Sequence, residues 1–155
     1  MPRISRPLTA GERALAASMF GSAIDYDAAT VRRQKWFPFQ PRNTAMAPCG
    51  HIHFHPKSDL WRDDYAQAPI GLQGLFLHEL AHVWQAQRRG RYYLPLMRHP
   101  FCRYSYTIRP GWPLERYGLE QQGEIVRHAF LLRQGRSVPG AGALDQYESI
   151  LPFDA

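Results

Sequence analysis

Residues 70–88 constrain the fold of this 155-residue chain more than any other segment, because their apolar residues recur with a helical period. Leu72, Phe76 and Leu80 follow one another at four-residue intervals in IGLQGLFLHELAHVWQAQR. Gly90 comes directly after this stretch and is typical of a helix C-terminus. The sequence therefore predicts a long helix over residues 70–88, with an apolar side that other parts of the chain must cover.

The same segment contains His78-Glu79-Leu80-Ala81-His82. Residues four apart lie on one face of a helix, so His78 and His82 can direct two imidazole nitrogens at one zinc ion. Glu79 is turned by about 100° from His78 and stands beside the ion. There it can act as a general base on a zinc-bound water molecule. The pattern predicts a zinc hydrolase site; the alternative is an ordinary amphipathic helix.

A catalytic zinc ion needs a third protein ligand and one open position. Glu120 and Glu124 share a face of a second predicted helix, residues 114–133, and Gly123 between them would allow that helix to approach closely. We predict Glu120 as the ligand and Glu124 as the acceptor of an N–H from a ligand histidine. The reverse assignment stays open, and the downstream candidates considered are His99, Glu115, Glu120, Glu124 and His128.

Other residues are candidates for supporting roles. In a strand, alternate residues share a face, so His51, His53 and His55 would line one side as a second metal site or as a polar face bordering the zinc cleft. A zinc hydrolase also needs a donor that stabilises the oxyanion or orients substrate. The sequence offers four candidates without choosing among them, and simple packing is the alternative for each: His99, Tyr104, Tyr106 and Tyr117.

The remaining segments predict an α+β fold in a single domain, residues 1–155. Thr9 and Glu12 fit a capping box that begins a helix over residues 9–20. A possible short strand covers residues 29–33, and two strands joined by a tight turn are expected around residues 43–55. Residues 91–113 contain four prolines and predict an irregular excursion, and a last short helix is expected over residues 144–150.

Composition narrows the function classes. Nineteen Lys+Arg against thirteen Asp+Glu give a net charge of +6, which indicates either an anionic partner or a solvated basic surface. No nucleic-acid-binding motif accompanies the charge, so nucleic acid is not favoured as a partner. Two cysteines, Cys49 and Cys102, make no disulfide framework and favour a reducing compartment.

No apolar run approaches the roughly 18 residues of a membrane span. Pro7, Gly11 and Glu12 interrupt the N-terminal segment, which therefore does not predict a secretory signal. The expected location is the cytoplasm, or outside the cell after export without a conventional signal peptide.

With HELAHVWQ and EQQGE the chain resembles a minimal zincin of the gluzincin kind. That resemblance implies zinc bound by His78, His82 and Glu120, with Glu79 as the base. It also implies an acidic residue behind the site at Glu124, a position where the family usually has aspartate. The implied fold is a small zincin-like domain, in which a short antiparallel β-hairpin or sheet packs on the HExxH helix and a second helix bears the third ligand.

HELAHVWQ after HIHFHP also resembles the small HExxH domain found with extracellular contractile injection systems, and bacterial proteins related to Vgr or Rhs. The second resemblance extends through FPFQPRNTAMAP, RHPFCRY, PGWPLERYG and LEQQGEIVRHAFLLRQG. It implies a metallopeptidase linked to a type VI-like secretion system, with a peptide or protein substrate and a partner in the secretion apparatus. The alternatives are a non-catalytic scaffold stabilised by zinc and a nucleic-acid-associated metalloprotease.

Overall fold

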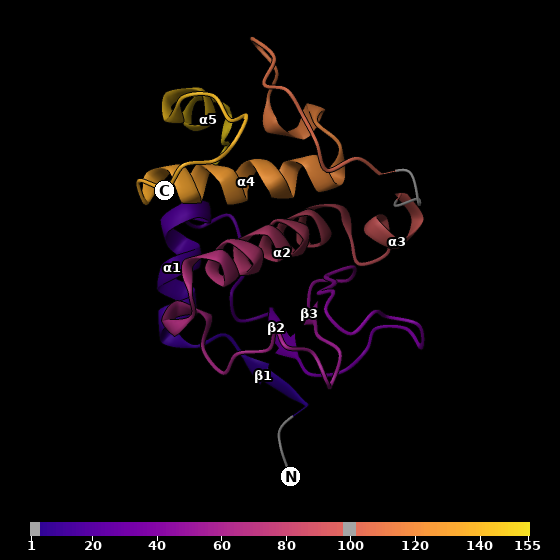
Figure 1. Ribbon diagram of the computed structural model, residues 1–155. Helices are drawn as coiled ribbons and strands as arrows, with labels where there is room; N and C mark the ends of the chain where they lie inside the picture. Colours follow the sequence, from indigo (N-terminus) through magenta and orange to yellow (C-terminus); the bar gives the residue numbers. More distant parts are fainter. Residues whose placement is uncertain (1–3, 98–101) are drawn as a thin grey trace.

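The computed structural model describes residues 4–97 and 102–155. Within these ranges it confirms the α+β class, with a small sheet and five α-helices that lie to one side of it (Figure 1). The strands are β1 (Ser5–Pro7), β2 (Thr30–Arg32) and β3 (Ile52–His53). The helices are α1 (Ala10–Phe20), α2 (Ile70–Arg89), α3 (Tyr93–Met97), α4 (Leu119–Arg133) and α5 (Leu144–Ile150).

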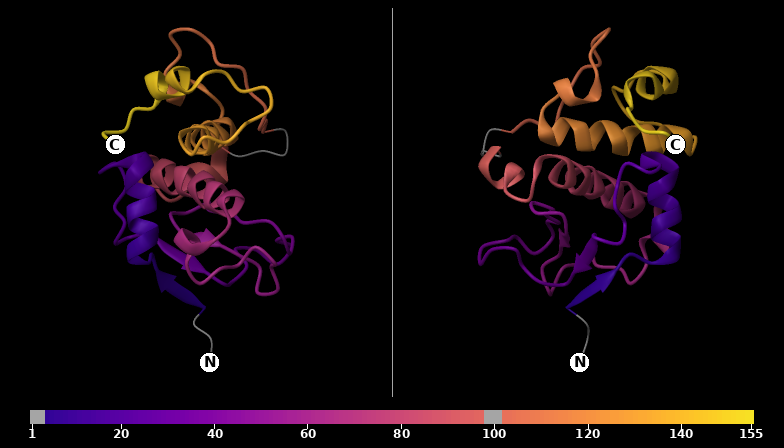
Figure 2. Two further views of the ribbon diagram at one scale, coloured as in Figure 1. Left: turned by 60° about the vertical axis from the view of Figure 1, so that its left-hand side comes forward. Right: turned by 180° about the vertical axis from the view of Figure 1, so that it is seen from behind.

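Helix α2 lies at the centre of the molecule, between the sheet and α4 (Figures 1 and 2). Its residues 76–86 are all buried, because α4 covers one side and the sheet with α1 covers others. Phe76, Leu77 and Leu80 are fully buried there and form the middle of the hydrophobic core. The histidines of α2 are therefore held by a helix that is fixed on several sides. None of the described helices is long and apolar enough to cross a membrane.

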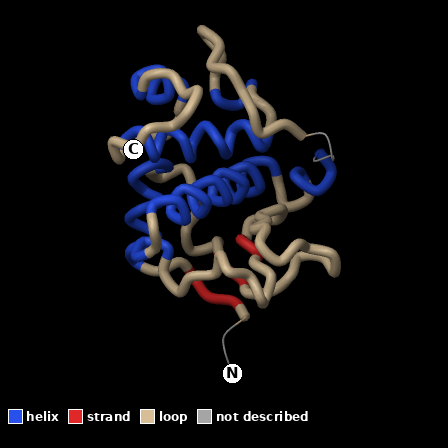
Figure 3. The backbone as a smooth tube through the Cα atoms, viewed as in Figure 1, coloured by secondary structure: helices blue, strands red, loops and turns tan. Residues whose placement is uncertain are grey.

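The sheet differs from the expected antiparallel hairpin. Its strand order is β1-β2-β3, and β2 pairs antiparallel with β1 but parallel with β3. The expected hairpin is reduced to one antiparallel bridge between Met46 and His53. Figure 3 shows how little of this region is regular strand. On one side of this bridge Pro48 lacks a backbone N–H group for the ladder. On the other side the N–H of Thr44 donates to the Pro41 carbonyl, and the Thr44 carbonyl accepts from the Gln40 side chain.

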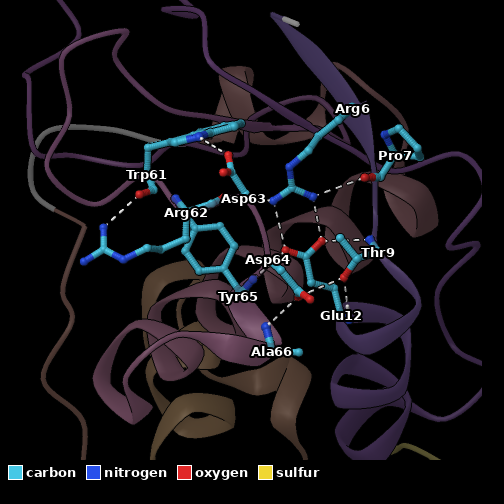
Figure 4. Close-up of polar contacts among 10 residues, drawn as sticks. All are labelled: Arg6, Pro7, Thr9, Glu12, Trp61, Arg62, Asp63, Asp64, Tyr65 and Ala66. Atoms are coloured by element: carbon cyan, nitrogen blue, oxygen red, sulfur yellow. Dashed lines mark hydrogen bonds and ion pairs between the residues drawn. The ribbon is translucent and has the colours of Figure 1, made fainter. Parts of the chain in front are cut away.

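The N-terminus of α1 is held by a buried carboxylate. Thr9 and Glu12 form the predicted capping box, which is confirmed by their reciprocal side-chain to backbone hydrogen bonds. Glu12 is fully buried, and Arg6 reaches it with two nitrogens at 2.8 and 3.0 Å (Figure 4). The backbone N–H of Tyr65 donates to the same carboxylate at 2.8 Å. One side chain thus ties β1, α1 and the turn before α2 together.

The last two-thirds of the chain follows the predicted order with shifted boundaries. Helix α4 begins at Leu119, because residues Leu114–Arg116 form a separate 3-10 turn before Gly118. The proline-rich excursion contains the five-residue α3, which the sequence did not predict. The final helix coincides with its expected range, 144–150. These boundaries place the first turn of α4 beside the middle of α2.

Candidate metal centre

Three buried side chains from two helices converge on one point. His78 and His82 come from successive turns of α2, and Glu120 comes from the first turn of α4. One ligand atom from each lies within 4.8 Å of the others. Nε2 of His82 is 2.8 Å from Oε1 of Glu120, and Nε2 of His78 is 3.4 Å from Oε2. The three residues are between 4 and 5% exposed. Together they form a group that can hold a metal ion.

Gly123 allows α4 to approach this closely. A Cβ atom built on Gly123 would lie 2.8–2.9 Å from three atoms of the His78 ring. Real Cβ atoms do not come this near to other heavy atoms, so any side chain at position 123 would displace the imidazole. The close approach expected from the sequence is confirmed.

The donor atoms fit a bound cation better than they fit one another. Nε2 of His82 has no acceptable hydrogen bond although the Glu120 carboxylate is 2.8 Å away, because the two groups are not aligned as donor and acceptor. A buried ring nitrogen left in this way is costly unless a ligand completes it. Two imidazoles and one carboxylate form a set that binds a divalent metal ion and leaves coordination positions for other groups.

A chain of amide groups fixes the His82 ring. Nε2 of Gln85 donates to the carbonyl of Leu119 and to Oε1 of Gln122, and Nε2 of Gln122 donates to the carbonyl of Tyr117. Backbone carbonyls only accept, so the amide nitrogens must face them. Oε1 of Gln85 is therefore left to accept from Nδ1 of His82 at 2.8 Å. The proton of a neutral His82 is then on Nδ1, and its Nε2 lone pair points at the metal group.

His78 is backed by a different set of residues. Oε1 of Glu124 lies 3.6 Å from Nδ1 of His78, close to the expected position but longer than a hydrogen bond. The other carboxylate oxygen of Glu124 is 3.2 Å from Nε2 of His128. The hydroxyl of Tyr106 is 2.6 Å from Nδ1 of His128 and 2.7 Å from the Tyr147 hydroxyl. Glu124 is thus held from behind by α4 itself and by α5.

The charges in this group perturb one another strongly. Burial acts to raise the pKa of Glu120, but the neighbouring imidazoles outweigh it and hold that pKa far below its usual range. For His82, burial acts to lower the pKa, but the carboxylates of Glu120 and Glu79 overcome it and raise the pKa. Without a metal ion the group therefore favours a carboxylate beside a protonated imidazole. Because a metal needs neutral imidazole, its binding would release a proton.

Two cavities meet at the metal group. The smaller, about 220 Å³, is lined by Glu79 and by polar residues including Asn43 and Arg127. The larger, about 370 Å³, is mostly apolar. His82, Glu120 and Tyr104 line both cavities. Glu79 is 6% exposed, so it lies at the wall of the smaller cavity rather than in open solvent.

Among the tyrosine candidates, the structure places Tyr104 at the site. Its ring stacks against that of His78, with centroids 6.2 Å apart. The Tyr117 hydroxyl accepts from the backbone N–H of Arg109, away from both cavities. Tyr106 lines neither cavity and reaches the site only through His128 and Glu124. His99 lies outside the described residues.

The three strand histidines do not gather. His51 contacts the Thr30 hydroxyl, His53 is buried against the carbonyl of Gln34, and Nδ1 of His55 accepts from a nearby backbone N–H. Within residues 4–97 and 102–155, the His78–His82–Glu120 group is the one cluster found that could hold a metal ion. A second metal site at the three histidines is therefore not supported.

Some residues around the site were not predicted from the sequence. Gln85 and Gln122 complete the amide chain, and Arg127 lines the smaller cavity. A spacing signal existed for Gln85, which follows His82 by three residues and so lies on the same helix face. Glu115, a candidate ligand, instead pairs with Arg88 and Arg89.

Comparison with known proteins adds evolutionary context. No family model matches the chain. The type VI secretion system spike protein VgrG2b of Pseudomonas aeruginosa is 38% identical over 132 residues, which cover 81% of this chain and 13% of that protein. The structure of the effector domain of VgrG2b matches with a TM-score of 0.74 and 34% identity, over 93% of this chain and 80% of that domain. The chain belongs to the family of the VgrG2b effector domain.

The relationship to VgrG2b concerns the effector domain, because the chain spans only 13% of the length of the complete spike protein. The predicted resemblance to Vgr-related proteins is confirmed. The match to the VgrG2b effector domain covers nearly all of this chain.

Proposed function

We propose that this chain is a zinc-dependent peptidase that acts as an effector domain of a type VI secretion system. The observation that carries the proposal is the convergence of His78, His82 and Glu120 on one point, with Glu79 at the wall of the adjoining cavity. The acid that follows the first histidine is thus beside the metal group and also faces space that a substrate can enter.

Zinc is the metal that this donor set favours. Imidazole nitrogens suit zinc, and two histidines with one carboxylate form a common catalytic zinc set that leaves one position open. The amide chain from Gln85 places the proton of a neutral His82 on Nδ1, so the lone pair of Nε2 is directed at the metal group. Gly123 leaves the space that the His78 ring occupies on the other side. Both rings are therefore held in position to act as metal ligands.

When bound, zinc would supply a Lewis acid that polarises a carbonyl and lowers the pKa of a water molecule. Glu79 would take the proton from the attacking water and later deliver it to the leaving amine. Tyr104, at the junction of the two cavities, is in place to contact the substrate carbonyl. The three side chains of the metal group are buried, which strengthens electrostatic interactions among them.

The backbone beside the site favours a peptide as substrate. Met46 exchanges both backbone hydrogen bonds with His53, so the N–H and C=O groups of Ala45 and Ala47 point away from β3. Ala45 lines the smaller cavity and Ala47 the larger one. An extended peptide that crosses the metal group from one cavity to the other would pass along this segment.

Delivery through the secretion apparatus is proposed from the relative. VgrG2b is a type VI secretion system spike protein, and the matched part of it is called an effector domain. We infer that this chain reaches its target in the same way, on or with a spike. Copurification with a spike protein of the same bacterium tests this part, and failure to find any association under native conditions would contradict it.

Zinc content and cleavage together test the catalytic part. Purified wild type is expected to contain about one zinc ion per chain and to cleave members of a peptide library. Glu79→Gln should retain the zinc and lose cleavage, whereas Glu120→Ala should lose most of the zinc. Full zinc affinity in Glu120→Ala would contradict the ligand set.

Thermal stability after chelation and nucleic-acid binding separate the alternatives. A zinc-stabilised scaffold would lose thermal stability on chelation but would show no cleavage in the wild type. A nucleic-acid-associated protein would bind DNA or RNA with an affinity that falls steeply with salt.

A further inference from the structure

The larger cavity has a chemical character that its neighbour lacks. It has a volume of about 370 Å³, and its walls are formed by Trp36, Phe37, Met46, Leu94, Pro95 and Tyr104. Among the described residues that line it, the only carboxylate is Glu120 and the only imidazole is His82, and both belong to the metal group. The smaller cavity, in contrast, contains Glu79, Glu124 and Arg127. The metal group therefore separates an apolar space from a charged one.

Exposed apolar residues concentrate around the apolar side. In the part of the chain that the structure describes, seven large hydrophobic residues are exposed. All but Ile4 come from the segments that form this cavity or continue from it: Trp36, Phe39, Tyr92, Leu96, Met97 and Tyr104. Phe39 and Leu96 are 85% and 80% exposed. The β2–β3 connection and α3 project on the same side of the molecule in Figures 1 and 2. Such a concentration of exposed apolar side chains is typical of a binding surface.

We propose that the larger cavity binds a bulky apolar side chain of the substrate, next to the bond that is cut. This inference rests on the proposed peptidase function and adds a substrate class to it: polypeptide segments with an aromatic or long aliphatic residue beside the scissile bond. A peptide that crosses the metal group along Ala45–Ala47 passes from one cavity into the other, because His82, Glu120 and Tyr104 line both.

Size and polarity both favour this occupant. A cavity of roughly 150 Å³ with apolar walls is enough to bind benzene, so about 370 Å³ accommodates a phenylalanine, leucine, methionine or tryptophan side chain. An alanine would leave most of the wall without contacts. A carboxylate would lose its hydration without gaining a cationic side chain, since no lysine or arginine of the described residues lines this cavity. An ammonium group would meet only Glu120, the carboxylate that belongs to the metal group.

Digestion of a peptide library of diverse sequence by the zinc-loaded wild type, read by mass spectrometry, tests the inference without any variant. Cleavage sites should be enriched in large apolar residues at one position beside the cut. Peptides that differ only there should be cleaved about 10- to 100-fold faster with phenylalanine or leucine than with alanine or aspartate. Cleavage without this preference would overturn the inference and leave the peptidase function intact.

Equilibrium binding gives a readout that does not depend on turnover. Blocked peptides with phenylalanine or alanine at that position are titrated calorimetrically into Glu79→Gln, with and without Trp36→Ala. The phenylalanine peptide should bind more tightly, and Trp36→Ala should reduce the difference between the two peptides.

Tyr92→Ala is the matched control, because Tyr92 is 62% exposed on the same side but lines neither cavity. Equal binding of the two peptides would overturn the inference. So would an equal loss of the preference for the phenylalanine peptide in Trp36→Ala and in Tyr92→Ala. Selective binding in Glu79→Gln with no cleavage by wild type would support the apolar site and contradict the peptidase function.

Discussion

Gly123 of α4 lies so close to His78 of α2 that a Cβ atom at position 123 would be 2.8 Å from Cε1 of the imidazole. The absence of a side chain at one position of α4 therefore sets the position of a ring on another helix. A side chain at this position could not be accommodated by a small shift, because the nearest atoms belong to a buried ring rather than to the flexible end of a side chain.

Gly123→Ala is expected to weaken zinc binding by about 10- to 100-fold, because it displaces His78 from its position beside Glu120. Competition with a fluorescent chelator measures this affinity. Gly74→Ala is the matched control in the same pair of helices. A Cβ at Gly74 would meet the flexible Arg127 side chain at 3.2 Å, and alanine favours the helix. Equal zinc affinities for both variants would contradict the steric argument.

Gln85→Leu is also expected to lower zinc affinity about 10- to 100-fold, because Nδ1 of His82 loses its acceptor and the ring loses its orientation. Gln85→Glu keeps an acceptor but not the donor to Gln122, so it should lower the thermal stability more than the zinc affinity. Gln87→Leu is the control, since Gln87 is on the same helix and bonds to Asp25 at the surface. A similar loss of zinc affinity in that variant would refute a specific role for Gln85.

Glu12→Gln is expected to lower the free energy of unfolding by about 3 kcal/mol, because it removes the charge that compensates the partly buried Arg6. Urea denaturation followed by circular dichroism measures the change. Asp27→Asn breaks an ion pair between Asp27 and Arg13. The Asp27 carboxylate is 85% exposed, so this substitution should have little measurable effect on stability. A small effect of Glu12→Gln would mean that hydrogen bonds without charge are sufficient at this position.

Acid should destabilise the fold through His53. Burial lowers the pKa of His53 to about 4 from its usual value of 6.5, against the opposing hydrogen bond with the Gln34 carbonyl. Between these values the unfolded state binds a proton that the folded state does not, so the free energy of unfolding falls as the pH falls through this range. His53→Gln should flatten that dependence in denaturation curves measured across the range. His55→Gln, at a less buried position, is the control, and an unchanged slope in His53→Gln would exclude this origin.

Local patterns were sufficient to predict several features correctly. The capping box at Thr9 and Glu12, the length of α2 and the range of α5 all depend on residues within a few positions of one another. Helical spacing also placed His78 and His82 on one face, because that geometry is fixed by the backbone alone.

The sequence left Glu120 and Glu124 as alternatives for the third member of the group, and the structure brings Glu120 to both histidines. The spacing of Glu120, Gly123 and Glu124 indicated this member, because the three residues share one helix face and Gly123 has no side chain to keep another helix away. That this face meets α2, rather than solvent, is decided by the packing of the two helices.

Pairing between distant segments could not be read from the sequence. Ser5–Pro7 has no alternating pattern, and it becomes β1 because β2, more than twenty residues later, offers it a partner. The parallel pairing of β2 with β3 likewise depends on how the intervening loop crosses the molecule.

The sequence by itself determined the chemistry available on each helix, because the spacing of His78, Glu79 and His82 follows from local backbone geometry. Only the tertiary structure decided which groups surround that chemistry. It placed Gln85 against His82, Tyr104 beside His78, and an apolar cavity on one side of the metal group with a charged one on the other. These relations join residues from segments far apart in the chain, so they arise from the packing of the whole core rather than from any local pattern.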